Sequence, residues 1–313
     1  MNKIHKIAFI FPGQGSQYVG MGEDFYNNFE CCKDVFNESS NLLDIDMKRL
    51  CFEDNEQINL TRYTQIAMVT VCRAILTKIE SMGIRADVCA GLSLGEYPAL
   101  MASGIISFKD GLLVVKKRGE LMEEAVEPGI GMMAAVLGLE NGLLESICKE
   151  SNGTVTVANY NCNGQAVITG VRKSVLQISE RLKEVGAKKV IPLNVSGPFH
   201  SPMLKEAGEK LYQVLEKARI NEPVIPYVSN VNASYITESK DIASLLSKQV
   251  YSPVLWQQSI ETMIDNNVTT MIEIGPGKTL SAMVRKINKE IKCINIDKVE
   301  DLDKLKEVLH AYR

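Results

Sequence analysis

The residues of this sequence best suited to covalent chemistry form the run GLSLG at Gly91–Gly95. A serine in the pattern G-x-S-x-G, directly after an apolar segment, is typical of a sharp strand-to-helix turn that holds the hydroxyl out for attack. The pattern is short and recurs by chance. Ser93 therefore predicts a nucleophile only if the chain also supplies a base and a site for an oxyanion.

A serine hydroxyl needs a neighbouring base, most often histidine, because it is almost fully protonated at neutral pH. The chain has three histidines. We expect His5, before the first apolar run, and His310, off the apolar stripe of the last segment, to be surface residues. His200 instead sits in NVSGPFHSP, where a glycine and two prolines predict a rigid loop between a strand and a helix. A helix-capping role is the alternative for His200.

Several motifs occur together in one order over nearly the whole chain. They are FPGQGSQYVGMG (11–22), GLSLGEY (91–97), KKRGELM (116–122), GPFHSP (197–202), Gln249 in KQVYSPVLW (248–256) and EIGPG (273–277). The set is far more specific than any of its members, and it resembles the malonyl-CoA:acyl-carrier-protein transacylase family.

The resemblance implies a role for each matching residue. Ser93 corresponds to the nucleophile and His200 to its base. Gln249 marks the place where an oxygen, rather than an aspartate, orients the imidazole. The backbone N–H groups of Gln14 and Leu94 correspond to the oxyanion site. Reading GQGSQ as a phosphate loop is weaker, since the Lys-Ser/Thr ending of such loops is missing.

Arg118 lies on the apolar stripe of a predicted helix, four residues from Val114 and four from Met122. A cation on a buried face needs an anionic partner. The resemblance makes that partner the free carboxylate of a malonyl group, whereas the alternative is an ion pair with a carboxylate of the protein itself. Met122 and Phe199 are expected to border the acyl group, and the ring of Phe199 predicts a preference for malonyl over methylmalonyl.

The chain departs from the family pattern at two positions of the nucleophile motif. Leu92 stands where the family usually has a histidine, which puts the positioning of the nucleophile in question. Pro98 stands where a small hydroxyl residue is common, and a proline in the first turn of a helix is tolerated.

Strand-like runs alternate with helix-period segments, which predicts an α/β fold with a parallel sheet. Within 129–197 the predicted order β-α-β-β-α-β is the ferredoxin-like pattern. We therefore expect a ferredoxin-like small domain at 129–197, inserted in a catalytic domain formed by 1–128 and 198–313. The resemblance implies that the larger domain has an α/β-hydrolase-like core.

Composition indicates an ordinary globular protein of 313 residues, with 45% hydrophobic and 23% charged residues and a net charge of −3. That charge argues against nucleic-acid binding. The eight cysteines show no C-x-x-C spacing, no apolar run is long enough to span a membrane, and the N-terminus lacks a signal-peptide pattern. We expect a cytoplasmic, monomeric protein with reduced thiols, no metal and no cofactor.

The combined expectation is an acyltransferase that moves malonyl from malonyl-CoA to acyl carrier protein through an acyl-serine, for fatty acid synthesis. Three alternatives stay open: a trans-acting acyltransferase of a polyketide pathway, a serine thioesterase or hydrolase, and a carrier-protein docking module without catalysis. Because carrier proteins are acidic, we expect a basic rim where the carrier docks. The candidates for this rim are Lys116, Lys117, Lys188, Lys189, Arg285 and Lys286.

Overall fold

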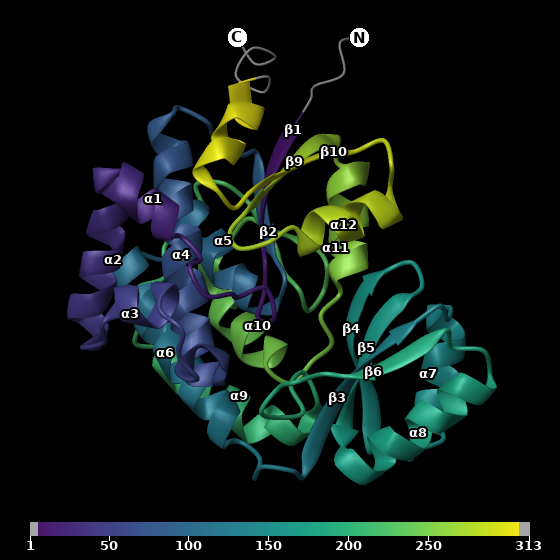
Figure 1. The fold of residues 1–313 in the computed structure, drawn as a ribbon. Helices are drawn as coiled ribbons and strands as arrows, with labels where there is room; N and C mark the ends of the chain where they lie inside the picture. The colour runs from purple at the N-terminus through teal and green to yellow at the C-terminus, as the bar shows by residue number, and fades with distance from the viewer. Residues whose placement is uncertain (1–5, 307–313) are drawn as a thin grey trace.

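The computed structural model describes residues 6–306, which form a six-stranded and a four-stranded sheet. The strands of the larger sheet are β1 (Lys6–Phe11), β2 (Val88–Gly91), β7 (Tyr227–Val228), β8 (Tyr235–Ile236), β9 (Val268–Ile274) and β10 (Lys292–Ile296). Those of the smaller sheet are β3 (Gly131–Leu137), β4 (Val155–Cys162), β5 (Gln165–Val171) and β6 (Lys189–Pro192). Figure 1 shows the smaller sheet beside the larger one.

The larger sheet has the order β10-β9-β1-β2-β7-β8 and is parallel except for the edge strand β8. The apolar run of β1 alternates between two cores, with Phe9 and Phe11 in one and Ala8 and Ile10 in the other. Strands covered on both faces read as continuous apolar runs, which is why these segments were predictable. The expected α/β fold with a parallel sheet is confirmed.

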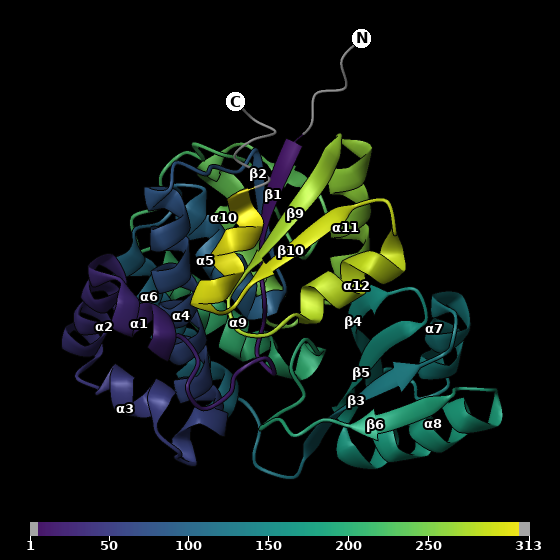
Figure 2. The ribbon, with the colours of Figure 1, turned by 45° about the horizontal axis from the view of Figure 1, so that its top comes forward.

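Helices cover both faces of this sheet (Figure 2). Phe9 and Phe11 pack in one core with α1 to α6, α9 and α10, and α11 and α12 pack on the opposite face. Within residues 6–306, no helix combines the length and apolarity needed to cross a bilayer. The helices are α1 (Glu23–Asn28), α2 (Glu30–Leu43), α3 (Met47–Phe52), α4 (Thr61–Ser81), α5 (Glu96–Ala102), α6 (Phe108–Glu124), α7 (Asn141–Lys149), α8 (Arg172–Glu184), α9 (Lys205–Leu215), α10 (Ile242–Gln249), α11 (Trp256–Asp265) and α12 (Thr279–Ile287).

The smaller sheet is antiparallel, in the order β4-β5-β3-β6. Its strands alternate: Met132 and Ala134 of β3 pack in a core with α7 and α8, whereas Met133 and Ala135 line a cavity. Because side chains of a strand point to opposite faces, one face of this sheet is sealed by helices and the other is a cavity wall.

Two backbone hydrogen bonds connect the smaller sheet to the segment that precedes α11. Tyr160 donates its N–H to the carbonyl of Val254, and Val254 donates to the carbonyl of Ala158, at 2.9 and 2.8 Å. These bonds attach β4 to the segment that leads into α11. The cavity wall is thereby held against the larger sheet.

Most predicted elements are present, with differences at their ends. The apolar run at 224–228 predicts a strand, but only Tyr227–Val228 pairs with β2. Pro223 and Pro226 lack the N–H that a longer strand needs. The expected final helix is a 3₁₀ helix at Val299–Leu305 within the described residues. The helices α1, α2, α3 and α11 were not predicted.

Gly95→Ala should lower the free energy of unfolding by about 3 kcal/mol or more, because the new Cβ would overpack against backbone. An ideal Cβ at Gly95 lies 2.1 Å from the carbonyl oxygen of Phe11 and 2.9 Å from that of Pro12. Urea unfolding measures the effect. Gly142→Ala in α7 is the control, since its nearest neighbour is the flexible end of Glu140 at 3.2 Å. The control should change stability by less than about 1 kcal/mol, and equal losses would contradict the prediction.

Candidate active site

Ser93 lies on a tight turn between β2 and α5, at the carboxyl edge of the larger sheet. Its backbone is left-handed, with φ of 53°, which is rare for serine. Gly91 and Gly95 allow the turn, because an ideal Cβ at Gly91 would lie 1.9 Å from the backbone of Gly95. Asn230, which follows β7, accepts the N–H of Ser93 at 2.6 Å and donates to the carbonyl of Gly91 at 2.7 Å. Asn230 therefore holds the turn from the neighbouring strand.

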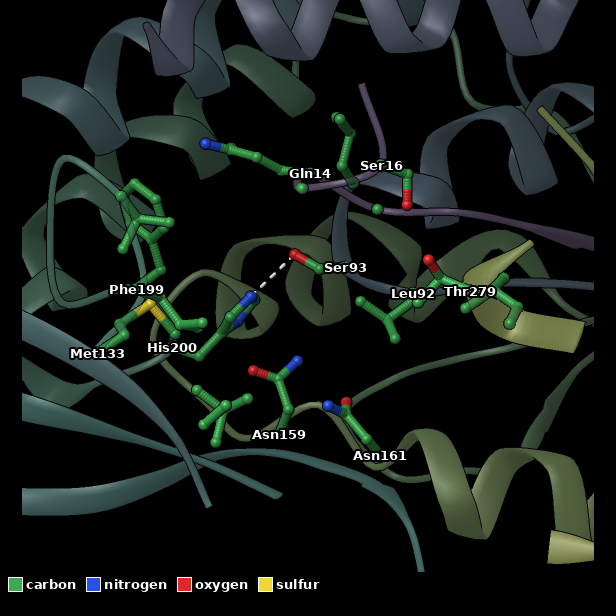
Figure 3. A pocket seen from close by; sticks show the side chains of 18 of the residues that line it. Gln14, Ser16, Leu92, Ser93, Met133, Asn159, Asn161, Phe199, His200 and Thr279 are labelled. Atoms are coloured by element: carbon green, nitrogen blue, oxygen red, sulfur yellow. Dashed lines mark hydrogen bonds between the residues drawn. The ribbon is translucent and has the colours of Figure 1, made fainter. Parts of the chain in front are cut away.

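The structure brings His200 to Ser93, with 2.8 Å between Oγ and Nε2 (Figure 3). The Nδ1 atom of His200 lies 2.8 Å from the backbone carbonyl of Gln249. A carbonyl only accepts hydrogen bonds, so Nδ1 carries the proton and Nε2 is left as an acceptor for the serine hydroxyl. The oxygen that faces Nδ1 is thus the backbone oxygen of Gln249, and this geometry suits a general base beside a nucleophile.

His200 is buried, with 4% of its surface exposed. Burial, and then the nearby charge of Arg118, lowers the pKa of His200 to about 4. The direction of this pKa shift favours catalysis, because a lowered pKa leaves the imidazole uncharged at pH values near 7. A neutral imidazole is the form that can take the proton from Ser93.

The guanidinium of Arg118 reaches the same point from α6, although the residue is only 1% exposed. It donates to Gln65 Oε1 at 2.8 Å, to Gln249 Oε1 at 2.9 Å and to Ser93 Oγ at 3.2 Å. Among the described residues, no carboxylate oxygen lies within 4.0 Å of its nitrogens. Burial lowers the pKa of Arg118, which is the mark of a cation without full compensation. The expected alternative, an ion pair with the protein's own carboxylate, is wrong.

A cavity of about 270 Å³ opens in front of Ser93 and His200. One wall carries Asn159 and Asn161 of β4, opposite Gln14 in Figure 3. The N-terminal end of α12 forms another wall, with Thr279 and Leu280. The lining thus combines apolar side chains with a few polar groups, as in small-molecule sites.

The predicted site residues meet around this cavity. Those that line it are Gln14, Ser93, Leu94, Arg118, Met122, Phe199 and His200. Gln249 lies directly behind, bonded to His200 and Arg118. His5 and His310, expected to be surface residues, lie outside the described residues.

The polar residues of the site that were not identified from the sequence include Gln65, Asn159, Asn161 and Asn230. A signal existed for Asn159 and Asn161, because two asparagines at alternate positions of an apolar strand face the same side. No local pattern singles out Asn230, which is 137 residues from Ser93 in the chain.

Leu92 does not disturb the nucleophile. Its backbone N–H donates to the carbonyl of Phe11 and its carbonyl accepts from Gly95, both at 3.0 Å. Its side chain lines the cavity and packs against the core under α11 and α12. Pro98 lies in the first turn of α5, where its missing N–H is not needed, as predicted.

Gly13 is required by the close approach of two backbone segments. An ideal Cβ at Gly13 would lie 2.5 Å from the carbonyl oxygen of Leu92. A side chain would therefore separate the loop after β1 from the nucleophile turn. Gly15 has φ of 103°, which favours glycine.

Comparison with known proteins gives one consistent result. A family model described as an acyl transferase domain matches residues 8–306. The malonyl CoA-acyl carrier protein transacylase of Bacillus subtilis (strain 168) is 47% identical over 302 residues, covering 95% of this chain and 95% of that protein.

Solved structures agree over the whole fold. The malonyl CoA-acyl carrier protein transacylase from Clostridium perfringens ATCC 13124 has a TM-score of 0.94 at 46% identity, covering 98% of each chain. A malonyl-transacylase in complex with a type II PKS acyl-carrier protein has a TM-score of 0.94 at 34% identity, covering 97% of this chain and 99% of that one.

The imidazole of His200 should stay neutral when the pH falls from about 8 to about 5.5, because its pKa is lowered to about 4 from 6.5. NMR of protein labelled with ¹³C at histidine Cε1 measures this, and His200→Gln identifies the signal. In Arg118→Gln the signal should titrate at higher pH, since one cause of the lowered pKa is removed. A wild-type midpoint near 6.5 would contradict the prediction.

Proposed function

The chain belongs to the acyl transferase domain family, and on this premise we propose that it is an acyl-carrier-protein S-malonyltransferase. It moves malonyl from malonyl-CoA to the phosphopantetheine thiol of acyl carrier protein. The curated relative and the solved neighbours carry the name of this activity. The neighbour bound to an acyl-carrier protein supports the second partner.

The observation that carries the choice of substrate is the position of Arg118. Its buried guanidinium lies 3.2 Å from the nucleophile Oγ and has only neutral partners. A planar guanidinium binds a carboxylate through two parallel hydrogen bonds. A malonyl thioester has a carboxylate two bonds beyond its reactive carbonyl, so both ends fit one cavity.

We propose that His200 Nε2 takes the proton of Ser93 as Oγ attacks the thioester carbonyl. The C–S bond then breaks, and His200 returns the proton to the departing CoA sulfur. In the second half, the carrier thiol gives its proton to His200 and its sulfur attacks the carbonyl of the acyl-serine. The C–O bond to Ser93 then breaks, and His200 returns the proton to Ser93 Oγ. Arg118 holds the carboxylate through both halves.

The oxyanion is assigned to the backbone N–H groups of Gln14 and Leu94. Both residues line the cavity at the nucleophile. The N–H of Ser93 is occupied by Asn230 and is unsuited to this role. Preorganised donors of this kind supply much of the stabilisation in acyl transfer.

Phe199 and Met122 are proposed to border the acyl chain. Both are buried, at 5% and 3% exposure, and both line the cavity. With the carboxylate and the carbonyl each held, the α-carbon of malonyl has little freedom. A ring at Phe199 therefore disfavours an added methyl group.

For the architecture, we propose an α/β-hydrolase-like catalytic domain at 1–128 and 198–313, with a ferredoxin-like domain inserted at 129–197. Support comes from the order β4-β5-β3-β6 of the antiparallel sheet and from its separate core with α7 and α8. In this scheme the inserted domain supplies one wall of the acyl cavity.

We assign the pathway as fatty acid synthesis, in agreement with the bacterial relatives. Service to a polyketide pathway stays an alternative, since one similar structure pairs with a type II PKS carrier. Lys286 is a candidate for the carrier-facing rim, because its Nζ donates to the cavity residue Gln165 at 3.1 Å. Cytoplasmic location and a monomeric state stay predictions.

Mixing the protein with malonyl-CoA should add one malonyl group to Ser93, detected by mass spectrometry of the intact protein and its peptides. Ser93→Ala should give no adduct, and His200→Ala should lower transfer by roughly 10³-fold or more, since nucleophile and base act as a unit. His310→Ala is the control and should leave transfer unchanged. A hydrolase would instead release malonate in the absence of carrier protein. Near-normal transfer by His200→Ala would refute the mechanism.

Arg118→Ala should lower kcat/KM for malonyl-CoA by roughly 30- to 1000-fold, because one bidentate, charge-assisted contact is lost. Activity with acetyl-CoA should be kept or increased, since acetyl has no carboxylate. Steady-state kinetics with both thioesters measure the selectivity. An equal fall for both substrates would mean that Arg118 is structural.

A further inference from the structure

Glu96 is a buried carboxyl group that the mechanism above does not use. It is the first residue of α5, three positions after Ser93, and is 0% exposed. Its Oε2 accepts a hydrogen bond from Gln249 Nε2 at 2.7 Å. Its Oε1 has no hydrogen-bond partner among the described residues. Burying a carboxyl group costs free energy of folding, so the presence of Glu96 beside Gln249 needs an explanation.

Gln249 is the residue through which the parts of the site are connected. Its backbone carbonyl orients His200 at 2.8 Å. Its side-chain Oε1 accepts from Arg118 at 2.9 Å. Its Nε2 donates to the carbonyl of Ser93 at 2.8 Å and to Glu96 at 2.7 Å. Nucleophile, base and arginine therefore all contact this one residue.

The direction of the Gln249 amide decides whether Gln249 offers Arg118 an acceptor in addition to Gln65 Oε1 and Ser93 Oγ. If the amide turned over, its NH₂ group would face the guanidinium, and both groups only donate hydrogen bonds. Its oxygen would then face the carbonyl of Ser93, which only accepts. Ser93 and Glu96 accept both hydrogens of Nε2 in the observed direction, so together they fix the amide.

We propose that Glu96 is a positioning residue that, by accepting the Nε2–H of Gln249, directs the amide oxygen to Arg118 and so fixes the guanidinium for the acyl carboxylate. This inference rests on the proposed function of Arg118. It assigns to Glu96 a part in substrate recognition without contact with substrate.

A purely structural role predicts something different. If Glu96 only fills space beneath the nucleophile turn, its loss should disturb Ser93 itself. Every reaction of Ser93 would then slow down, whatever the charge of the reagent. If Glu96 acts through Gln249, its removal should slow the reaction of Ser93 only with substrates that carry a carboxylate.

The first part of the test compares Glu96→Leu with Glu96→Gln. Leucine removes the acceptor, and we expect kcat/KM for malonyl-CoA to fall by roughly 10- to 100-fold. Glutamine keeps an acceptor oxygen and should stay within about threefold of wild type. Phenylmethanesulfonyl fluoride, a neutral reagent for activated serines, should label Ser93 in both variants at near the wild-type rate. Slow labelling of Glu96→Leu would overturn the proposal.

The second part is a double-mutant cycle with Gln249→Ala, which removes the amide but keeps the backbone carbonyl that orients His200. In this background Glu96→Leu should change malonyl kcat/KM by less than about twofold, because the side chain it acts through is absent. If Glu96→Leu lowered malonyl kcat/KM by the same factor with and without the Gln249 side chain, the proposal would be overturned. A wild-type protein that forms no malonyl-serine would refute the proposed function instead, which is a separate outcome.

Discussion

The hydrogen bond between Ser93 Oγ and His200 Nε2 is the contact on which the rest of the site depends, and the backbone at both of its ends is left-handed. The φ angles are 53° at Ser93 and 59° at His200. Such conformations cost free energy and persist only where their surroundings impose them. Asn230 holds the N–H of Ser93, and the carbonyl of Val250 accepts the N–H of His200 at 3.1 Å. The fold therefore sets the proposed nucleophile and base in place before substrate arrives.

The electrostatics of the site follow from burying one cation beside one imidazole. Arg118 and His200 are both almost inaccessible, and the charge of the first helps to keep the second neutral. Burial raises the pKa of Glu96 to about 7, with Gln249 and Arg118 acting in the opposite direction. A carboxylate entering the cavity would meet a guanidinium that lacks a full counter-charge. This arrangement favours an anionic acyl group over a neutral one.

The sequence predicted the residues whose signal is local. Ser93 follows from its motif, Arg118 from helical periodicity, and His200 from a search among three histidines. The N-cap of α6 is local in the same sense, since the Ser107 hydroxyl accepts the N–H of Asp110, three residues further along the chain. Asn230 and Gln65 were missed because their roles come from packing between distant segments, and no spacing rule encodes that. The strand expected at 224–228 was shortened by prolines whose effect depends on which neighbour pairs with them.

Leu92, the expected departure from the family pattern, draws attention to the contacts that hold the nucleophile turn. The turn is held by backbone bonds of Leu92 to Phe11 and Gly95 and by the side chain of Asn230. None of these contacts uses the side chain at position 92. The leucine instead joins the core beneath the cavity, where an apolar group needs no hydrogen-bond partner. Because the serine–histidine distance is 2.8 Å with leucine in place, the substitution gives no structural reason to regard the protein as a docking module without catalysis.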